Sequence, residues 1–92
     1  MHARLTKFQS NDIDAMVAMI PDIKGKLAAI PGMVRSQVAW NADGSGASMT
    51  LYDSAASAEA AVPMIQEIWG SMAQYLAAPP ETSGFEAADI MV

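Results

Sequence analysis

The sequence predicts an α+β domain with the element order β-α-β-β-α-β, the ferredoxin-like arrangement. Two observations support this fold class. Strand-like alternation of apolar and polar residues occurs near the N-terminus, in two arms around a turn, and near the C-terminus. Two segments with apolar residues at spacings of three and four separate these strands, as amphipathic helices do. Right-handed crossovers then give one four-stranded antiparallel sheet with both helices on a single face.

The first strand and helix follow from residues 3–31. Residues 3–9 alternate as a strand does, and Ser10 or Asn11 is predicted to cap the following helix. Pro21 lies inside the helical pattern, where it cannot donate a backbone hydrogen bond, so a kink or break is expected near Ile20. The sequence Pro-Gly-Met at 31–33 ends the helix.

A β-hairpin follows, with arms at Met33–Trp40 and Ala47–Tyr52 joined by the turn sequence NADGSG. One face is predicted to be apolar and to pack on the helices. It carries Val34, Val38 and Trp40 of the first arm and Ala47, Met49 and Leu51 of the second. The opposite face is predicted to be mixed and carries Met33, Gln37, Thr50 and Tyr52. A face of this kind covers something other than water.

The second helix and the last strand complete the order. Ser54 or Ser57 is predicted to cap the helix, and Pro63 to interrupt it or to begin a fresh segment. A broad apolar stripe runs from Met64 to Ala78 before the sequence APPETSG ends the helix. The segment 85–92, FEAADIMV, is predicted to form the fourth strand.

Length and composition indicate one domain, residues 1–92, that associates with a second copy of itself. The chain is 52% hydrophobic and only 16% charged, whereas roughly 25% is typical. A domain this small cannot easily hide so much apolar surface. Since both helices cover one sheet face, the other face is predicted to be covered by another copy of the protein, in a homodimer.

Charge and residue usage exclude several functional classes. The net charge is −5, and the five Lys and Arg residues are scattered, so no nucleic-acid surface is expected. The absence of cysteine excludes disulfides, thiolate catalysis and cysteine-based metal sites. The N-terminus lacks the apolar core of a signal peptide, and no stretch approaches the roughly 18 apolar residues of a membrane span. A cytoplasmic protein without membrane contact is expected.

The stretch IPGMVRSQVAWNADGSGASMTLYDSAASAEAA, between an amphipathic helix and a Trp-bearing helix, resembles the dimeric α/β-barrel superfamily. More narrowly, it is similar to the antibiotic-biosynthesis-monooxygenase-like branch of that superfamily. The resemblance implies a homodimer whose sheets pack face to face into a barrel, with a pocket between the sheet and helices of each subunit. Family activities include cofactor-independent oxygenation of polycyclic phenols, quinol oxidation and haem degradation, and many members have no known activity.

The resemblance also implies candidate catalytic residues. Quinone-forming oxygenases of this family use a Trp and a Tyr about two turns apart on the second helix, and Trp69 and Tyr75 match these in type and approximate place. Trp69 would stack on a planar substrate, and Tyr75 would hydrogen-bond its oxygen. The family's polar amide has no match, because Ile65 stands at the equivalent turn. Alternatively, Trp69 and Tyr75 simply fill the core.

Arg35, Gln37 and Met72 are the candidate substrate-binding residues. Arg35 lies mid-strand, where a charge is costly unless it is paired or faces a ligand. It could bind an anionic substrate, pair with Asp89 or Glu86 of the last strand, or lie exposed at a barrel rim, and the structural pair is favoured.

Haem degradation is disfavoured because the family's axial histidine is absent from the second helix and His2 is the only histidine. No metal site and no hydrolytic triad can be assembled. Two hypotheses therefore remain. The first is a cofactor-independent monooxygenase or related enzyme acting on a small aromatic substrate. The second is a non-catalytic homodimeric module that binds a small ligand or another protein. A pocket of several hundred Å³ near Trp69 with convergent polar groups would favour the first.

Overall fold

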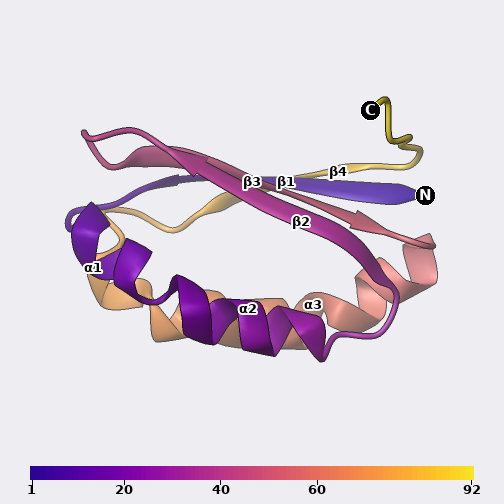
Figure 1. Cartoon of the computed structure of the whole chain (residues 1–92), viewed down its shortest axis with the longest axis horizontal. Coiled ribbons are helices and arrows are strands. Elements are labelled where there is room, and N and C mark those ends of the chain that lie inside the picture. Colours follow the sequence, from indigo (N-terminus) through magenta and orange to yellow (C-terminus); the bar gives the residue numbers. More distant parts are fainter.

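The computed structural model describes all 92 residues and confirms the predicted topology, with the strand order β2-β3-β1-β4 in one antiparallel sheet. All helices cover one face of that sheet (Figure 1). The elements, with η1 a 3₁₀ turn, are β1 (His2–Gln9), α1 (Ile13–Ala18), α2 (Ile20–Ala28), β2 (Met33–Trp40), β3 (Ser45–Tyr52), α3 (Ala55–Ser71), η1 (Ala73–Tyr75) and β4 (Glu81–Phe85). No helix combines the length and the apolar character that crossing a membrane requires.

The break in the first helix occurs where Pro21 predicts it, because α1 ends at Ala18 and α2 begins at Ile20. The predicted cap was wrong. The N-cap is Asp12, whose Oδ1 accepts a hydrogen bond from the backbone N–H of Ala15 at 3.2 Å. Ser10 has a different role, since its buried hydroxyl donates to the carbonyl of Tyr75 at 2.8 Å and so ties the end of β1 to η1.

The turn of the hairpin sets which residues of β2 and β3 share a face. The backbone N–H of Gly44 donates to the carbonyl of Asn41 at 3.0 Å, and that of Asn41 donates to the carbonyl of Ser45 at 2.8 Å. The loop therefore has three residues, and Gly44 has a φ of 91°, the left-handed region that suits glycine. With an odd number of loop residues, even-numbered residues of β2 lie opposite even-numbered residues of β3 and share a face with them. Val38 therefore lies opposite Ser48.

The predicted composition of the two sheet faces was wrong for this reason. The helix-facing side of the hairpin carries Ser36, Val38, Trp40, Ser48, Thr50 and Tyr52. The open side carries Arg35, Gln37, Met49 and Leu51. A bulge between Met33 and Arg35 shifts the register, and Met33 packs on the buried cluster that contains Tyr52. The helices therefore cover hydroxyl groups beside Val38 and Trp40, and Met49 and Leu51 face the side that the helices leave open.

The helix α3 is continuous, and the predicted interruption at Pro63 was wrong. Ser54 caps this helix by accepting a hydrogen bond from the N–H of Ser57 at 3.1 Å. Pro63 lies on the exposed side of α3, and so does Glu59, whose carbonyl would otherwise accept from residue 63. Water can satisfy that carbonyl, so the helix tolerates the proline. The helix ends at Ser71, and the predicted stripe to Ala78 therefore spans two elements.

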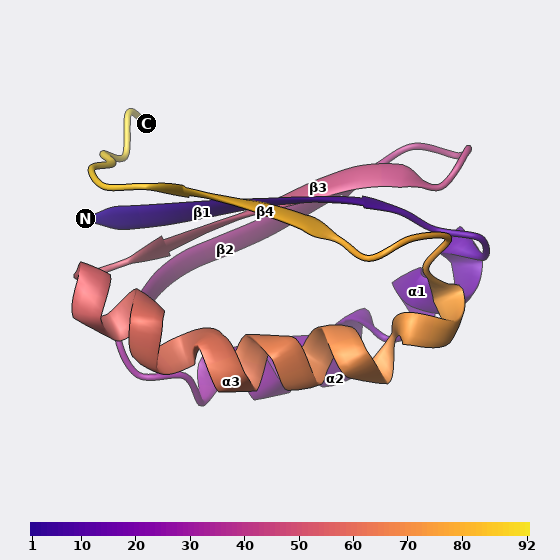
Figure 2. The same cartoon turned by 180° about the vertical axis from the view of Figure 1, so that it is seen from behind.

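The last strand lies earlier than predicted. β4 runs from Glu81 to Phe85, and residues 86–92 form no strand. The antiparallel ladder pairs Lys7 with Glu81 and Ala3 with Phe85. Because β1 begins at His2, residues after Phe85 have almost no β1 residues left to pair with. The C-terminal segment then leaves the sheet on the side opposite the helices (Figures 1 and 2).

Two buried clusters join the sheet to the helices. One is formed by Phe8, Met16, Ile68 and Met72, and the other by Ile30, Tyr52, Ala58 and Ala61. The ring of Phe8 lies against Gly46 of β3, where a Cβ atom would overlap that ring and would lie 2.6 Å from the carbonyl oxygen of Ala39. Glycine at position 46 therefore provides the space that the Phe8 ring occupies.

Gly46→Ala is expected to lower the free energy of unfolding by about 1–3 kcal/mol, because the Phe8 ring and the β2 backbone cannot both give way. The measurement is a urea unfolding curve at fixed protein concentration. Gly70→Ala is the matched control, since a Cβ there meets no atom within 4 Å and the alanine should stabilise α3 by roughly 0.5–1 kcal/mol. Equal unfolding midpoints for the two variants would contradict the packing assigned to Gly46.

Candidate functional site

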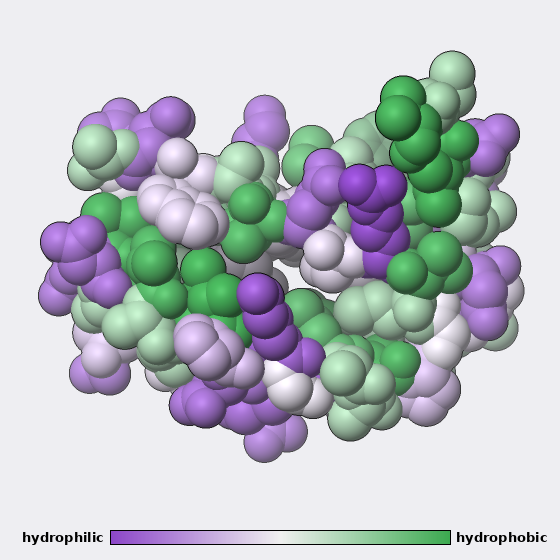
Figure 3. All heavy atoms as spheres, viewed as in Figure 1, coloured by the Kyte–Doolittle hydropathy of each residue, from purple (hydrophilic) through white to green (hydrophobic).

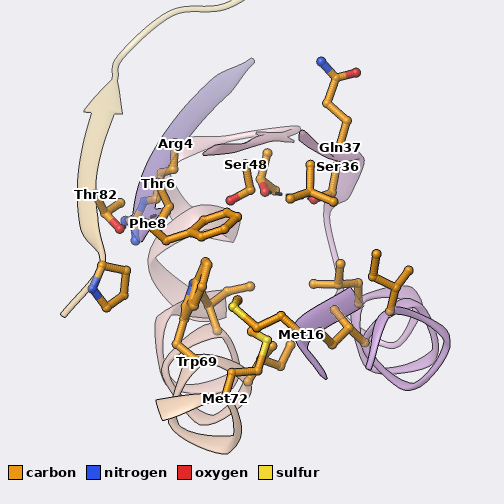
Figure 4. Close-up of a pocket in the computed structure, with 18 of the residues that line it drawn as sticks. Arg4, Thr6, Phe8, Met16, Ser36, Gln37, Ser48, Trp69, Met72 and Thr82 are labelled. Carbon is orange, nitrogen blue, oxygen red and sulfur yellow. Dashed lines mark hydrogen bonds between the residues drawn. The ribbon is translucent and has the colours of Figure 1, made fainter. Parts of the chain in front are cut away.

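A cavity of about 570 Å³ lies between the helix-facing side of the sheet and the helices (Figure 4). All four strands and the helices α1, α2 and α3 contribute to its lining. The molecule is hollowed between its strand layer and its helix layer on the side of β2 and α2 (Figure 3). The edge strand β2 borders this hollow, so the lining residues Val38 and Trp40 remain 44% and 42% exposed.

Five Ser and Thr hydroxyls lie on the sheet side of the cavity, beside Phe8, Val38 and Trp40. They belong to Thr6, Ser36, Ser48, Thr50 and Thr82. The hydroxyls of Thr6 and Thr82 lie 2.9 Å apart across β1 and β4, and those of Ser36 and Thr50 lie 3.1 Å apart across β2 and β3. The Ser48 hydroxyl has no hydrogen-bond partner within the protein, and each of the paired hydroxyls keeps acceptor capacity. The sheet side can therefore hydrogen-bond an oxygen of a ligand.

Mostly apolar and aromatic side chains form the helix side of the cavity, with Gln66 of α3 and Lys24 of α2 among them. Met16 of α1, Ile68 of α3 and Met72 are buried there against Phe8. The ring centroids of Phe8 and Trp69 are 5.7 Å apart with an interplanar angle of 50°, and Trp69 rises from α3 toward the sheet (Figure 4). Such a surface favours a flat apolar ligand.

Three groups that can carry charge line the cavity, namely Arg4, Lys24 and Tyr52. Arg4 forms the single ion pair of the structure, with Glu59 of α3 at 3.5 Å. Tyr52 is only 2% exposed, and burial raises the pKa of its hydroxyl while the positive charge of Arg4 partly opposes that rise. The Tyr52 hydroxyl is therefore protonated at neutral pH and can donate a hydrogen bond.

The structure separates the two predicted catalytic residues. Trp69 lines the cavity, and Met72, predicted to bind substrate, lines it as well. Tyr75 does not line it. Tyr75 lies in η1, its ring packs beside the cluster of Phe8 and Met16, and its carbonyl accepts hydrogen bonds from Ser10 and Asn11. Trp69 and Tyr75 are thus on different elements, because α3 ends at Ser71.

The other predicted binding residues lie toward the open face of the sheet. Arg35 borders a second hollow of about 470 Å³ on that face, beside Met49, Leu51 and the C-terminal segment. Gln37 borders both this hollow and the main cavity, and its side chain points away from the main cavity (Figure 4). Arg35 makes no ion pair with Asp89 or Glu86, so the favoured structural pair was wrong.

Sequence reasoning missed the polar side of the cavity. Arg4 and Thr6 alternate with Phe8 in the sequence, which places them on one face of β1, and this signal was available. Ser48, Thr50 and Tyr52 were assigned to the wrong side because the hairpin register was not known. No group of three or more His, Cys, Asp or Glu side chains lies close enough together to hold a metal ion. His2 does not line the cavity.

No protein-family model matches the sequence, and a comparison with curated proteins finds no match. Solved structures do match. A protein of unknown function from Nitrosomonas europaea, NE2512, superposes with a TM-score of 0.81 at 13% identity, over 99% of this chain and 94% of that one. SnoaB from Streptomyces nogalater, a cofactor-independent oxygenase, has a TM-score of 0.79 at 14% identity, over 98% and 95% of the two chains.

The ActVA-Orf6 monooxygenase of Streptomyces coelicolor, solved with the ligand Nanaomycin D, is also similar. Its TM-score is 0.74 at 12% identity, over 99% of this chain and 90% of that one. The resemblance to the antibiotic-biosynthesis-monooxygenase-like branch is therefore confirmed at the level of the fold. The chain shares the subunit fold of these oxygenases over nearly its whole length.

Proposed function

We propose that this protein is a cofactor-independent monooxygenase, or a related enzyme, that acts on a small aromatic phenol-like substrate in the cavity between sheet and helices. The observation that carries the proposal is the two-sided lining of that cavity. Aliphatic and aromatic side chains predominate on the helix side, and the sheet side adds five Ser and Thr hydroxyls to Phe8, Val38 and Trp40, around about 570 Å³. The fold shared with SnoaB and ActVA-Orf6 supports the same reading.

The residues would act mainly by binding and orienting the substrate. Trp69 and Phe8 offer aromatic faces to a planar ring, and Met72 closes the helix side around it. Ser48 and Thr50 lie across the cavity, where their hydroxyls can hydrogen-bond a phenol or ketone oxygen. An electron-rich phenol held in this way would react with dioxygen directly.

The proposed reaction converts a ring methylene into a carbonyl. One atom of dioxygen becomes the carbonyl oxygen, and the other leaves as water with the two hydrogens of the methylene. The substrate supplies all four electrons, so the balance requires no separate reductant. The family resemblance implies a catalytic role for Tyr75, but Tyr75 lies outside the cavity lining, so the proposed reaction does not depend on it.

The test is oxidation of anthrone, a tricyclic ketone with one reactive methylene, under air and under nitrogen. We expect oxygen uptake and quinone absorbance to rise with protein concentration, well above the uncatalysed rate. The nitrogen sample is the control for light-driven or contaminating oxidants. Anthrone binding without any protein-dependent oxygen uptake would overturn the enzymatic proposal.

One observation favours the second candidate, a non-catalytic small-ligand-binding module. No carboxylate or imidazole lines the cavity, so the protein offers no ordinary general base for deprotonating a substrate. The fate of anthrone separates the candidates, since a binding module retains it unchanged. In either role we propose a homodimer that forms through the open sheet face.

A further inference from the structure

The charges around the cavity differ in sign from those of the whole chain. The protein has ten acidic and five basic residues. None of the acidic residues lines the cavity, whereas Arg4 and Lys24 both do. In a hollow with low-dielectric walls, two positive charges without a lining carboxylate make the interior attractive to anions. The acidic surface thus encloses a cavity of positive character.

The ion pair between Arg4 and Glu59 is weak. Its single hydrogen bond runs from Nη2 of Arg4 to Oε2 of Glu59 at 3.5 Å, the long limit for such a contact. The Glu59 side chain is 81% exposed, while that of Arg4 is 27% exposed. An exposed pair of this kind contributes little to stability. The remaining N–H groups of Arg4 have no acceptor in the protein and can serve a ligand.

Tyr52 supplies a second donor near Arg4. Its side chain is almost fully buried and lines the cavity, yet its hydroxyl makes no hydrogen bond within the protein. The hydroxyl is not among the fully buried polar atoms, so it is accessible from the cavity and can donate to a ligand. The charge of Arg4 acts on this hydroxyl, as its effect on the Tyr52 pKa indicates. Arg4 and Tyr52 together therefore present donors without a competing carboxylate in the cavity lining.

We propose that Arg4 and Tyr52 form an anion subsite of the cavity, which selects ligands that carry a carboxylate or similar oxyanion on an aromatic body. The aromatic body would lie against Trp69, and the oxyanion would accept hydrogen bonds from the Arg4 guanidinium and the Tyr52 hydroxyl. Lys24, on α2, also lines the cavity and would add to the attraction. This inference rests on the proposed function, because the ligand is the one that the cavity holds.

Two fluorescent probes with the same aromatic rings test the proposal. 8-Anilinonaphthalene-1-sulfonate carries an oxyanion, and N-phenyl-1-naphthylamine is its neutral counterpart. We expect the wild-type protein to bind the anionic probe more tightly. Arg4→Met should weaken anionic binding roughly tenfold or more, the usual loss for a charge-assisted hydrogen bond, and should leave neutral binding within about twofold. Arg4→Lys should recover part of the loss, because it restores the charge without the planar fork.

Arg35→Met is the matched control, since it removes the same charge from the opposite face of the sheet. We expect it to change neither affinity. If Arg35→Met weakens the anionic probe and Arg4→Met does not, the anion binds at the open face and the proposal is overturned. If both probes bind equally and Arg4→Met changes neither affinity, the anion subsite is overturned, but the cavity still binds aromatic ligands. Binding of neither probe overturns the subsite and the proposed function together.

Tyr52→Phe provides a second variant that keeps the buried ring in place. It removes only the hydroxyl, which has no partner in the protein, so the fold should persist. We expect a fewfold weaker affinity for the anionic probe and an unchanged affinity for the neutral one. An unchanged affinity for both probes would remove Tyr52 from the subsite.

Discussion

Trp69→Leu should weaken binding of a neutral aromatic ligand about tenfold and reduce anthrone oxidation to the uncatalysed rate. Leucine preserves an apolar side chain against Phe8 and Met72 but removes the flat aromatic surface at the helix side of the cavity. Aromatic contacts of this kind contribute roughly 0.5–1.5 kcal/mol beyond the area they bury. The loss of substrate orientation should lower the oxidation rate further than affinity alone. Fluorescence titration with N-phenyl-1-naphthylamine and oxygen uptake measure the two effects.

Tyr75→Phe is the matched comparison, because it changes an aromatic residue of the same apolar cluster that lies outside the cavity lining. From the structure we expect the variant to bind and oxidise as the wild-type protein does. Lost oxidation with unchanged binding in Tyr75→Phe would instead support the catalytic role that the family resemblance implies. Unchanged binding and oxidation in Trp69→Leu would show that Trp69 only fills the core.

The fold could be predicted largely because its signals are local. Pro21 breaks the first helix wherever that helix packs, since the missing N–H and the ring act within one turn. Pro63 is the same residue type in a similar pattern, yet α3 continues through it. Both prolines are exposed, and so is Glu59, whose carbonyl loses its donor to Pro63. Val17, the residue four positions before Pro21, is instead half-buried at the cavity. A sequence pattern contains no such information about which side of a helix meets water.

The site was predicted less well than the fold because its side chains depend on register and on helix ends. A hairpin loop of three residues instead of an even number exchanges the faces of one arm, which moved Ser48 and Thr50 into the cavity. The end of α3 at Ser71 removed Tyr75 from the helix that carries Trp69. The places of Trp69 and Met72 could be predicted without the hairpin register or the exact end of α3. Both are apolar positions on one helical stripe, and such a stripe faces the core wherever the helix ends.

The same register makes the open sheet face a strong candidate for self-association. Leu5, Met49 and Leu51 lie there at neighbouring ladder positions, and Phe85 beside them is 45% exposed. The C-terminal segment rises from this face and leaves Met91 and Val92 almost fully exposed. Leu5, Met49 and Leu51 are half-buried and Phe85 is exposed, and apolar groups left uncovered in this way favour a partner surface of the same kind. A two-fold dimer would place two such faces against each other.

Met49→Asp should therefore convert the proposed homodimer into a monomer at micromolar concentration. In a two-fold interface the substitution introduces two carboxylates, and burying an ion without a partner costs several kcal/mol. The dissociation constant should rise roughly a thousandfold or more. Aspartate is the choice because its short side chain limits pairing with Arg35 of the same face. Light scattering coupled to size-exclusion chromatography measures the mass.

Ala60→Glu is the control for the added charge, because Ala60 is exposed on α3, away from the open sheet face, and glutamate is a good helix former. It should leave the mass unchanged. A wild-type monomer, or a dimer that persists in Met49→Asp, would show that this face does not hold two copies together. The anion subsite would survive that result, because the cavity that contains Arg4 and Tyr52 lies on the other side of the sheet. A monomer in Met49→Asp that still binds the anionic probe would show that each subunit holds a complete site.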